Sequence, residues 1–120
     1  MYESGENYLE TILILKEKQG TVRSIDIARA LNFSKPSVSR AVGILKEDGY
    51  IAVEAGGEIE LTEKGREKAG RIYERHQLLT EFLQKVGGVN SEVAEEDACK
   101  MEHIISEETF QGIKRFMKQA

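Results

Sequence analysis

Residues 24–46 read SIDIARALNFSKPSVSRAVGILK and predict two helices joined by a tight turn. The first helix covers residues 24–31, with Ser24 as its N-cap. Its apolar side chains recur at helical spacing and are Ile25, Ala28 and Leu31. A polar turn, Asn32-Phe33-Ser34, follows. Pro36 then stands in the first turn of the second helix, where proline is tolerated.

The second helix has two different sides. Its apolar stripe consists of Val38, Ala41, Val42 and Leu45. The other side carries small polar and basic residues, among them Ser37, Ser39, Arg40, Gly43 and Lys46. Asp48-Gly49 ends the helix, since glycine readily adopts the left-handed cap conformation. A helix that reads a DNA groove requires this separation of faces.

The flanking segments complete a winged helix-turn-helix. A helix over residues 6–19 precedes the motif and stops at Gly20; its helically spaced positions are Leu9, Ile12, Leu13 and Lys16. After the motif, residues 50–61 alternate apolar and polar side chains on both sides of Ala55-Gly56-Gly57, which predicts a β-hairpin. The order helix, helix, turn, helix, hairpin is typical of this motif.

Charge is distributed unevenly along the chain, whose formal net charge is −4. Residues 21–46 hold five basic residues and one acidic residue, whereas residues 47–60 hold five acidic residues and no basic one. A basic stretch in an acidic chain favours nucleic-acid binding by that stretch; a solvated helix pair with a chance excess of charge is the alternative. Because the hairpin has no Lys or Arg, we expect it to add little phosphate binding.

Length and cysteine content restrict the class of protein. A chain of 120 residues fits one domain, or two small lobes that share a core. The single cysteine excludes an internal disulfide framework and suits a reducing compartment. No apolar run reaches the roughly 20 residues of a membrane helix, and Met1-Tyr2-Glu3-Ser4 shows no sign of a signal peptide. We therefore expect a cytoplasmic protein without membrane contact.

The second half of the chain predicts three further helices. Thr62 is suited to cap a long helix that reaches about Val86 and ends at Gly87-Gly88. Another helix runs from Asn90 or Ser91 to about Ile105, and a last one starts at Ser106. One face of the last helix is apolar, with Phe110, Ile113, Phe116 and Met117. A monomer of this size can hardly cover that face, so we expect a homodimer through this lobe.

Residues 97–103, Asp-Ala-Cys-Lys-Met-Glu-His, contain three kinds of metal-binding group: a thiol, carboxyl groups and an imidazole. On a helix, Cys99, Glu102 and His103 are spaced i, i+3 and i+4 and share one face. A thiolate, a carboxylate and an imidazole then converge within one turn. A buried cysteine beside a surface Glu-His pair is the alternative.

Three residues elsewhere can add donors to this cluster. His76 is in phase with the apolar side of the long helix, and Asn7 and Glu10 are spaced i, i+3 on the first helix. A satisfied core histidine and two plain surface residues are the alternative. If the three helices pack together, all six side chains can meet in one pocket.

Several segments resemble the diphtheria toxin repressor family of metal-dependent transcription regulators, in particular its short manganese-regulator branch. The segments that carry the resemblance are Glu6–Ile12, Val22–Ala28, Ser34–Ser39, Leu61–Gly65, Arg75-His76 and Asp97–His103, and it extends to about Phe116. The resemblance implies a homodimer in which metal orders the N-terminal helix relative to the dimerisation lobe. Both winged helices then reach an inverted repeat in double-stranded DNA.

The resemblance also implies the metal ligands. Glu102, His103 and His76 match ligands of the family, and Cys99 is what the iron-responsive branch uses where the manganese branch has a carboxylate. Glu10 matches a carboxylate ligand of the manganese branch. Asn7 stands where that branch has Asp and the iron branch has Met.

Other positions bear on the number of metals and domains. Thr80 and Glu95 replace residues of the iron branch's ancillary site, so a site of that kind is not expected. A second metal held by Glu10, His76 and a shared Cys99 or Glu102 remains open. We also expect the short form of the family, without a C-terminal SH3-like domain.

The mixed donor set favours Fe²⁺ as the effector, with Mn²⁺ as the alternative. A thiolate at Cys99 suits borderline metals, and Asn7 supplies only a neutral oxygen, whereas the carboxylates of Glu10 and Glu102 suit Mn²⁺. In vitro, Co²⁺, Ni²⁺ and Zn²⁺ should bind more tightly than either ion, by the general order of divalent metals.

On the DNA side, the residues that match the family's recognition surface are Ser34, Pro36, Ser37, Ser39 and Arg40, and the basic stretch adds Arg23. The hydroxyls of Ser37 and Ser39 suit phosphate oxygens, and Arg40 suits a guanine or a phosphate. Pro36 is suited to contact a thymine methyl, or serves only to start the helix.

These patterns predict a mostly α fold with two domains. Residues 1–62 form a winged helix-turn-helix DNA-binding domain with a small β-hairpin wing, and residues 63–120 a helical metal-binding and dimerisation domain. We expect a metal-activated repressor of metal homeostasis genes. A metal enzyme is a rival, but the chain has two histidines and no Gly-rich phosphate loop or nucleophile motif. A winged-helix regulator without metal control, with Asn7 as its sign, is the other rival.

Overall fold

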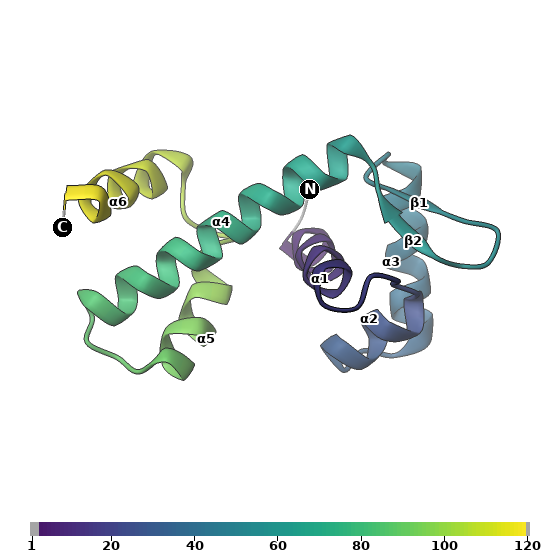
Figure 1. Ribbon diagram of the computed structural model, residues 1–120, viewed down its shortest axis with the longest axis horizontal. Coiled ribbons are helices and arrows are strands. Elements are labelled where there is room, and N and C mark those ends of the chain that lie inside the picture. Colours follow the sequence, from purple (N-terminus) through teal and green to yellow (C-terminus); the bar gives the residue numbers. More distant parts are fainter. Residues whose placement is uncertain (1–2, 120) are drawn as a thin grey trace. The chain divides into compact units, whose positions relative to one another are not determined.

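The computed structural model describes residues 3–119 and confirms the predicted mostly α fold (Figure 1). Its elements are α1 (Glu3–Gln19), α2 (Ser24–Leu31), α3 (Lys35–Glu47), β1 (Ile51–Val53), β2 (Ile59–Leu61), α4 (Glu63–Lys85), α5 (Ser91–Met101) and α6 (Glu107–Gln119). The chain divides into two compact units, residues 1–70 and 71–120. The functional boundary between residues 62 and 63 stays a prediction. Residues 1, 2 and 120, at the outer ends of the two predicted domains, lie outside the described residues.

The first unit has a continuous apolar core between α1, α2, α3 and the predicted hairpin. Its fully buried side chains include Leu9, Ile12, Val22, Ile27, Val38 and Ile59. β1 and β2 pair antiparallel, with Ile51 opposite Leu61 and Val53 opposite Ile59. The Ile59 N–H also donates to the Val22 carbonyl at 2.7 Å, which ties the hairpin to the segment between α1 and α2.

The N-cap of α2 differs from the predicted one. Arg23, and not the predicted Ser24, is the N-cap of α2, and its backbone N–H donates to Asp26 Oδ2 at 2.8 Å. The Asp26 carboxylate thus makes the half of a capping box in which the N3 side chain accepts from the N-cap N–H. Asn32 ends α2 with a φ of 56°, a left-handed conformation that asparagine tolerates.

Helix α4 begins in close contact with the end of α3. Thr62 caps it as predicted: its Oγ1 donates to the Gly49 carbonyl at 2.6 Å and accepts from the Gly65 N–H at 3.1 Å. Gly65 is buried there, and a Cβ at this position would collide with the main-chain carbonyl of Tyr50. A side chain is therefore excluded from the first turn of α4 at residue 65.

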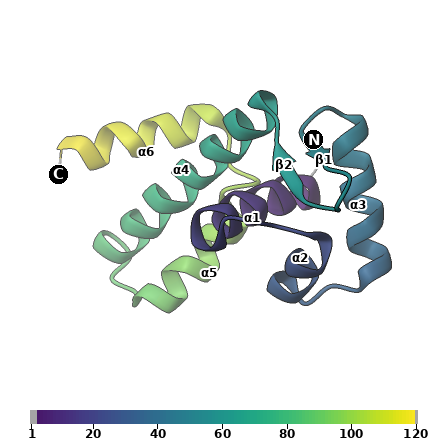
Figure 2. The same ribbon diagram turned by 45° about the vertical axis from the view of Figure 1, so that its right-hand side comes forward.

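The second unit consists of the remainder of α4 with α5 and α6, which lie on opposite sides of it in both views (Figures 1 and 2). Its buried apolar residues are Ile72, Leu79, Ala94, Ala98 and Phe110. Phe82 of α4 and Phe116 of α6 meet edge to face, with ring centroids 6.5 Å apart. The prediction that α5 continues to Ile105 is wrong, because the helix ends at Met101 and a turn follows.

Candidate metal centre and nucleic-acid interface

Helix α3 presents a polar and basic face to solvent. Its N-cap Ser34 accepts a hydrogen bond from the Ser37 N–H at 3.3 Å and donates to the Ser37 Oγ at 2.8 Å. Val38, Val42 and Leu45 are buried on the inner side. The residues predicted to contact DNA on this helix are all exposed: Ser34, Pro36, Ser37, Ser39 and Arg40. Helix α3 thus has the two faces that groove reading requires.

Two cations from outside the hairpin hold the wing, the segment from β1 to β2. The exposed Arg23 donates from Nη1 to the Gly56 carbonyl in the turn of the wing. Lys16, in the last turn of α1, pairs with Glu60 of β2 at 2.6 Å and with Glu58 at 3.7 Å. The pKa of the Glu60 carboxyl lies below its ordinary value, mainly because Lys16 donates a hydrogen bond to it. The wing has no Lys or Arg, so both of these positive charges come from elsewhere in the unit.

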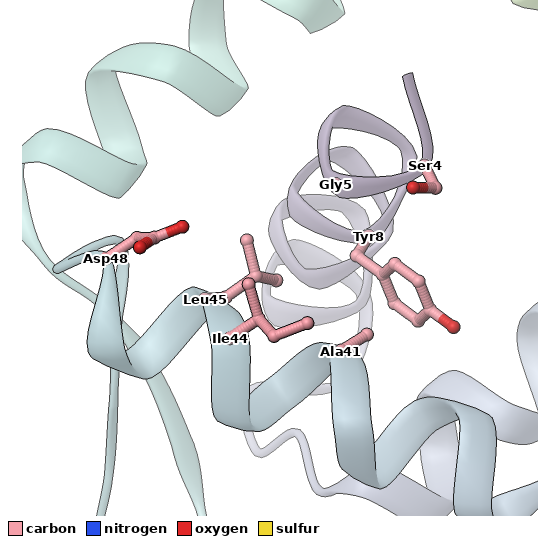
Figure 3. Close-up of a pocket in the computed structure, with 7 residues that line it drawn as sticks. All are labelled: Ser4, Gly5, Tyr8, Ala41, Ile44, Leu45 and Asp48. Carbon is pink, nitrogen blue, oxygen red and sulfur yellow. The ribbon is translucent and has the colours of Figure 1, made fainter. Parts of the chain in front are cut away.

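Helix α1 packs on α3 beside a hollow of about 370 Å³. Figure 3 shows its lining, which consists of Ser4, Gly5, Tyr8, Ala41, Ile44, Leu45 and Asp48. Tyr8 is buried, which raises the pKa of its hydroxyl, and its ring meets the Phe33 ring edge to face with centroids 5.9 Å apart. Tyr8, which lies between Asn7 and Glu10 on α1, thus contacts the turn that precedes α3.

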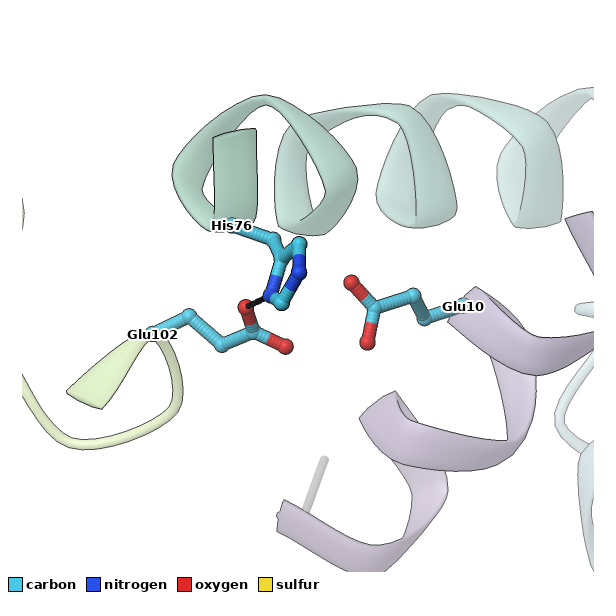
Figure 4. A group of neighbouring side chains, drawn as sticks. All are labelled: Glu10, His76 and Glu102. Carbon is cyan, nitrogen blue, oxygen red and sulfur yellow. Dashed lines mark hydrogen bonds and ion pairs between the residues drawn. The ribbon is translucent and has the colours of Figure 1, made fainter. Parts of the chain in front are cut away.

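Three predicted metal ligands converge in the second unit. His76 Nδ1 of α4 lies 2.8 Å from Glu102 Oε2, a contact that is drawn as a dashed line in Figure 4. His103 Nε2 lies 3.3 Å from Glu102 Oε1. The side chain of Glu102 is completely buried and that of His103 is 2% exposed. Burial of a carboxylate is costly unless hydrogen bonds or a cation compensate its charge. The two imidazoles and the buried carboxylate supply nitrogen and oxygen donors, which are residue types that bind divalent transition metals.

Cys99 lies one turn before this cluster, half-buried in the last part of α5. The prediction that Cys99, Glu102 and His103 share one helix is wrong in detail, because Glu102 is the C-cap of α5 and His103 lies in the turn beyond it. The Glu102 N–H nevertheless donates to the Ala98 carbonyl at 2.9 Å, which continues the helical pattern for one more residue.

The other two predicted ligands belong to the first unit. Glu10, the third residue drawn in Figure 4, is buried on α1, and Asn7 is half-buried one turn earlier. The Asn7 carbonyl accepts a hydrogen bond from the Thr11 hydroxyl at 2.8 Å. Metal binding by Asn7 and Glu10 stays a prediction.

The sequence includes Arg75 in a segment that carries the family resemblance but assigns it no role, and its side chain reaches the segment that carries Glu102 and His103. Its Nη1 donates to the main-chain carbonyls of Glu102 and Ile105, at 3.1 Å each. Its Nη2 lies 3.4 Å from Glu107 Oε2. The one signal in the sequence is the position of Arg75 directly before His76.

Two family models match nearly the whole chain. The model described as "Iron dependent repressor, N-terminal DNA binding domain" matches residues 1–57, and "Iron dependent repressor, metal binding and dimerisation domain" matches residues 62–120. The chain belongs to the iron-dependent repressor family. The resemblance in the sequence is thereby confirmed, and members of this family are metal-dependent transcriptional repressors, which confirms the prediction against a metal enzyme.

The relatives of this chain include an iron-dependent repressor and a manganese regulator. The transcriptional regulator MntR of Geobacillus thermodenitrificans is 40% identical over 103 residues, which cover 86% of this chain and 72% of MntR. The iron-dependent repressor IdeR of Mycobacterium tuberculosis H37Rv is 36% identical over 108 residues, which cover 90% of this chain and 47% of IdeR. The solved structure of the manganese regulator SloR matches with a TM-score of 0.85 at 26% identity and covers 97% of this chain and 54% of SloR.

The chain therefore spans about half the length of IdeR and of SloR. None of the helices within residues 3–119 combines the length and apolar character that crossing a bilayer requires.

Proposed function

We propose that this chain is a metal-activated repressor that binds DNA as a homodimer and controls metal homeostasis genes. The observation that carries the proposal is the buried Glu102 carboxylate in contact with His76 and His103, within the segment that matches the family's metal-binding domain. A bound divalent cation would compensate the negative charge of this buried carboxylate. The division into a DNA-binding domain over residues 1–62 and a metal-binding and dimerisation domain over 63–120 is part of this proposal.

In this proposal Cys99, Glu10 and Asn7 complete the ligand set. Cys99 is within one helical turn of Glu102 and requires a deprotonated thiol, so metal binding weakens as the pH falls and is lost on thiol oxidation. Asn7 and Glu10 are three residues apart on α1 and share a face of that helix. Control of DNA binding by metal is what the family resemblance implies.

We assign Fe²⁺ as the effector, with Mn²⁺ as the second candidate. The thiolate of Cys99 and the imidazoles of His76 and His103 are donors that suit Fe²⁺ better than Mn²⁺. The carboxylates of Glu10 and Glu102 support Mn²⁺, and the relatives include an iron-dependent repressor and a manganese regulator.

The exposed face of α3 is the surface that we assign to double-stranded DNA. Arg40, Ser37 and Ser39 supply a guanidinium and hydroxyls there, and Lys35 and Ser39 help to line a hollow of about 320 Å³ against α2. Arg23 adds a phosphate contact beside the wing, because its exposed guanidinium lies on the turn at Gly56.

The homodimer is supported by exposed apolar side chains in the second unit. Phe116 of α6 is 52% exposed and Ile104 is 73% exposed, in a segment that matches the family's dimerisation domain. Two subunits related by a two-fold axis would read an inverted repeat. Sedimentation velocity should show a dimer at tens of micromolar, and a monomer with and without metal would contradict this part of the proposal.

Anaerobic DNA-binding titrations against free Fe²⁺ and free Mn²⁺ test the assignment of the metal. The DNA is a duplex selected from a randomised pool with the wild-type chain, and the selected sequences should contain an inverted repeat. We expect the wild type to respond to Fe²⁺ at the lower free concentration and Cys99→Asp to shift the preference towards Mn²⁺. An equal response to both ions that Cys99→Asp leaves unchanged would remove Cys99 from the ligand set.

A further inference from the structure

We propose that Arg75 is a positioning residue for the metal centre, an inference that rests on the proposed role of the His76–Glu102–His103 cluster. Arg75 Nη1 donates to the main-chain carbonyl of Glu102 at 3.1 Å, and the next residue, His76, contacts the Glu102 carboxylate at 2.8 Å. Two consecutive residues of α4 therefore hold the main chain and the side chain of the same glutamate.

Arg75 supplies hydrogen bonds that the end of α5 cannot supply. Helix α5 ends at Met101, Glu102 is its C-cap, and Ile105 lies in the segment that follows, so the helix itself provides no donor for the carbonyls of these two residues. The guanidinium donates to the carbonyls of Glu102 and Ile105 and places a positive charge at the negative end of the helix dipole. Its side chain is 20% exposed, so water has limited access to take over these bonds.

Further contacts keep the guanidinium of Arg75 in place. Its Nη2 lies 3.4 Å from Glu107 Oε2 in the first turn of α6, and its Cζ lies 5.2 Å from the centroid of the buried Phe110 ring. Arg75 thus fastens the connection between α5 and α6 along its length. A planar guanidinium donates in several fixed directions and stacks on a ring, whereas a lysine ammonium reproduces only part of this set.

The connection held by Arg75 carries both Glu102 and His103. If it shifts, both side chains move relative to His76, which stands on a different helix. Residues that hydrogen-bond to metal ligands without contacting the metal typically contribute about 10–100-fold to metal affinity. Arg75 therefore acts on the metal through Glu102 and His103 without being a ligand.

Titration of the full chain with Mn²⁺, followed by electron paramagnetic resonance of the free ion, tests this role. We expect Arg75→Ala to weaken Mn²⁺ binding by about 10–100-fold and Arg75→Lys to weaken it less. The absorption spectrum of the Co²⁺ form should change in Arg75→Ala, since the arrangement of the ligands changes. The matched control is Lys114→Ala, which removes the 2.6 Å contact between Lys114 of α6 and Glu74 of α4 but leaves the connection untouched.

The outcomes separate this inference from the proposed function. If wild type binds Mn²⁺ and Glu102→Gln does not, but folded Arg75→Ala binds as wild type does, the positioning role is wrong and the metal centre stands. If neither wild type nor Arg75→Ala binds metal, both are wrong. Should circular dichroism show Arg75→Ala unfolded, Arg75→Lys decides: a weakened affinity with an altered Co²⁺ spectrum supports the role, and wild-type values overturn it.

Discussion

The two units are stabilised in different ways. The first unit surrounds a continuous apolar core that includes Leu9, Val38 and Ile59. Among the described residues, the second unit buries fewer apolar side chains, namely Ile72, Leu79, Ala94, Ala98 and Phe110. Each unit also buries one carboxylate, Glu10 in the first and Glu102 in the second. Close-packed apolar cores resist change. Because Glu102 is buried beside a smaller apolar core, the stability of the second unit depends more on what this charge binds.

An arginine that binds main-chain carbonyls occurs in both units, and the settings differ. Arg23 is exposed and binds the wing turn at Gly56, whereas Arg75 is 20% exposed and binds the turn after α5. Exposed charged contacts contribute little, because water competes for the same groups. We therefore expect Arg75 to stabilise the conformation of the turn after α5, and Arg23 to contribute mainly to DNA binding by the first unit.

The largest effect is expected for the buried charge of the second unit. Glu102→Gln keeps the size of the side chain but removes the negative charge. Mn²⁺ affinity should fall by about 100-fold or more, because mutation of residues that only orient a ligand already lowers metal affinity by up to about 100-fold. Calorimetric titration with Mn²⁺ measures this loss. The matched control is Glu108→Gln, an exposed residue of α6. Equal affinities in the two variants would mean that the buried charge does not bind metal.

A comparison of two glycines of α4 tests the close packing of the first unit. Gly65→Ala forces a Cβ against the Tyr50 carbonyl and should lower the free energy of unfolding by about 1–3 kcal/mol. Gly70→Ala meets nothing within 4 Å and should raise it by about 0.5–1 kcal/mol, because alanine favours the helix. Urea denaturation of both variants measures the pair. A Gly65→Ala protein as stable as wild type would show that the main chain at Tyr50 moves away from α4 at little cost in free energy.

A smaller effect is expected for the exposed arginine of the wing. Arg23→Ala should weaken DNA binding by about 1–2 kcal/mol and flatten its salt dependence by about one unit of slope, equally for specific and random duplexes. Arg29→Ala, which removes the same charge from another exposed position of α2, is the control. Anisotropy titrations at several salt concentrations give both quantities. If Arg23→Ala changes neither the DNA affinity nor its salt dependence, Arg23 does not contact DNA, and its role is limited to the hydrogen bond with the wing turn at Gly56.

The smallest effect is expected for the ion pair between α1 and the wing. Lys16 holds the pKa of Glu60 below its ordinary value, so the pair stabilises the fold above that ordinary value and ceases to do so as the pH falls through the lowered one. Glu60→Gln should therefore be slightly less stable than wild type at pH 7, and the difference should shrink as the pH is lowered through the acid range. A series of urea midpoints of the two proteins from pH 7 downwards tests this; a difference that does not change with pH would point to a cause other than charge.

The parts of the fold that could be predicted from the sequence depend on neighbours along the chain. The spacing of Val38, Val42 and Leu45 identifies the buried side of α3, and thereby its exposed side, because helical periodicity is a local property. The hairpin follows from alternation around two glycines for the same reason.

The remaining features depend on distant partners. The end of α5 at Met101 goes with contacts from Arg75, which lies 27 residues before Glu102, and periodicity carries no sign of such a contact. Arg23 was predicted from its charge alone, and its contact with the wing turn spans 33 residues. The convergence of His76, Glu102 and His103 was predicted only as an option open to packed helices.

The most direct test of the central claim, that metal bound in the second unit controls DNA binding by the first, is the affinity of the wild-type chain for one selected duplex. It is measured by anisotropy at fixed salt, once with saturating Fe²⁺ under anaerobic conditions and once in a chelator. The account predicts that the Kd falls by about tenfold or more when metal is present, which corresponds to a coupling of at least about 1.4 kcal/mol. The same Kd in both solutions would contradict it.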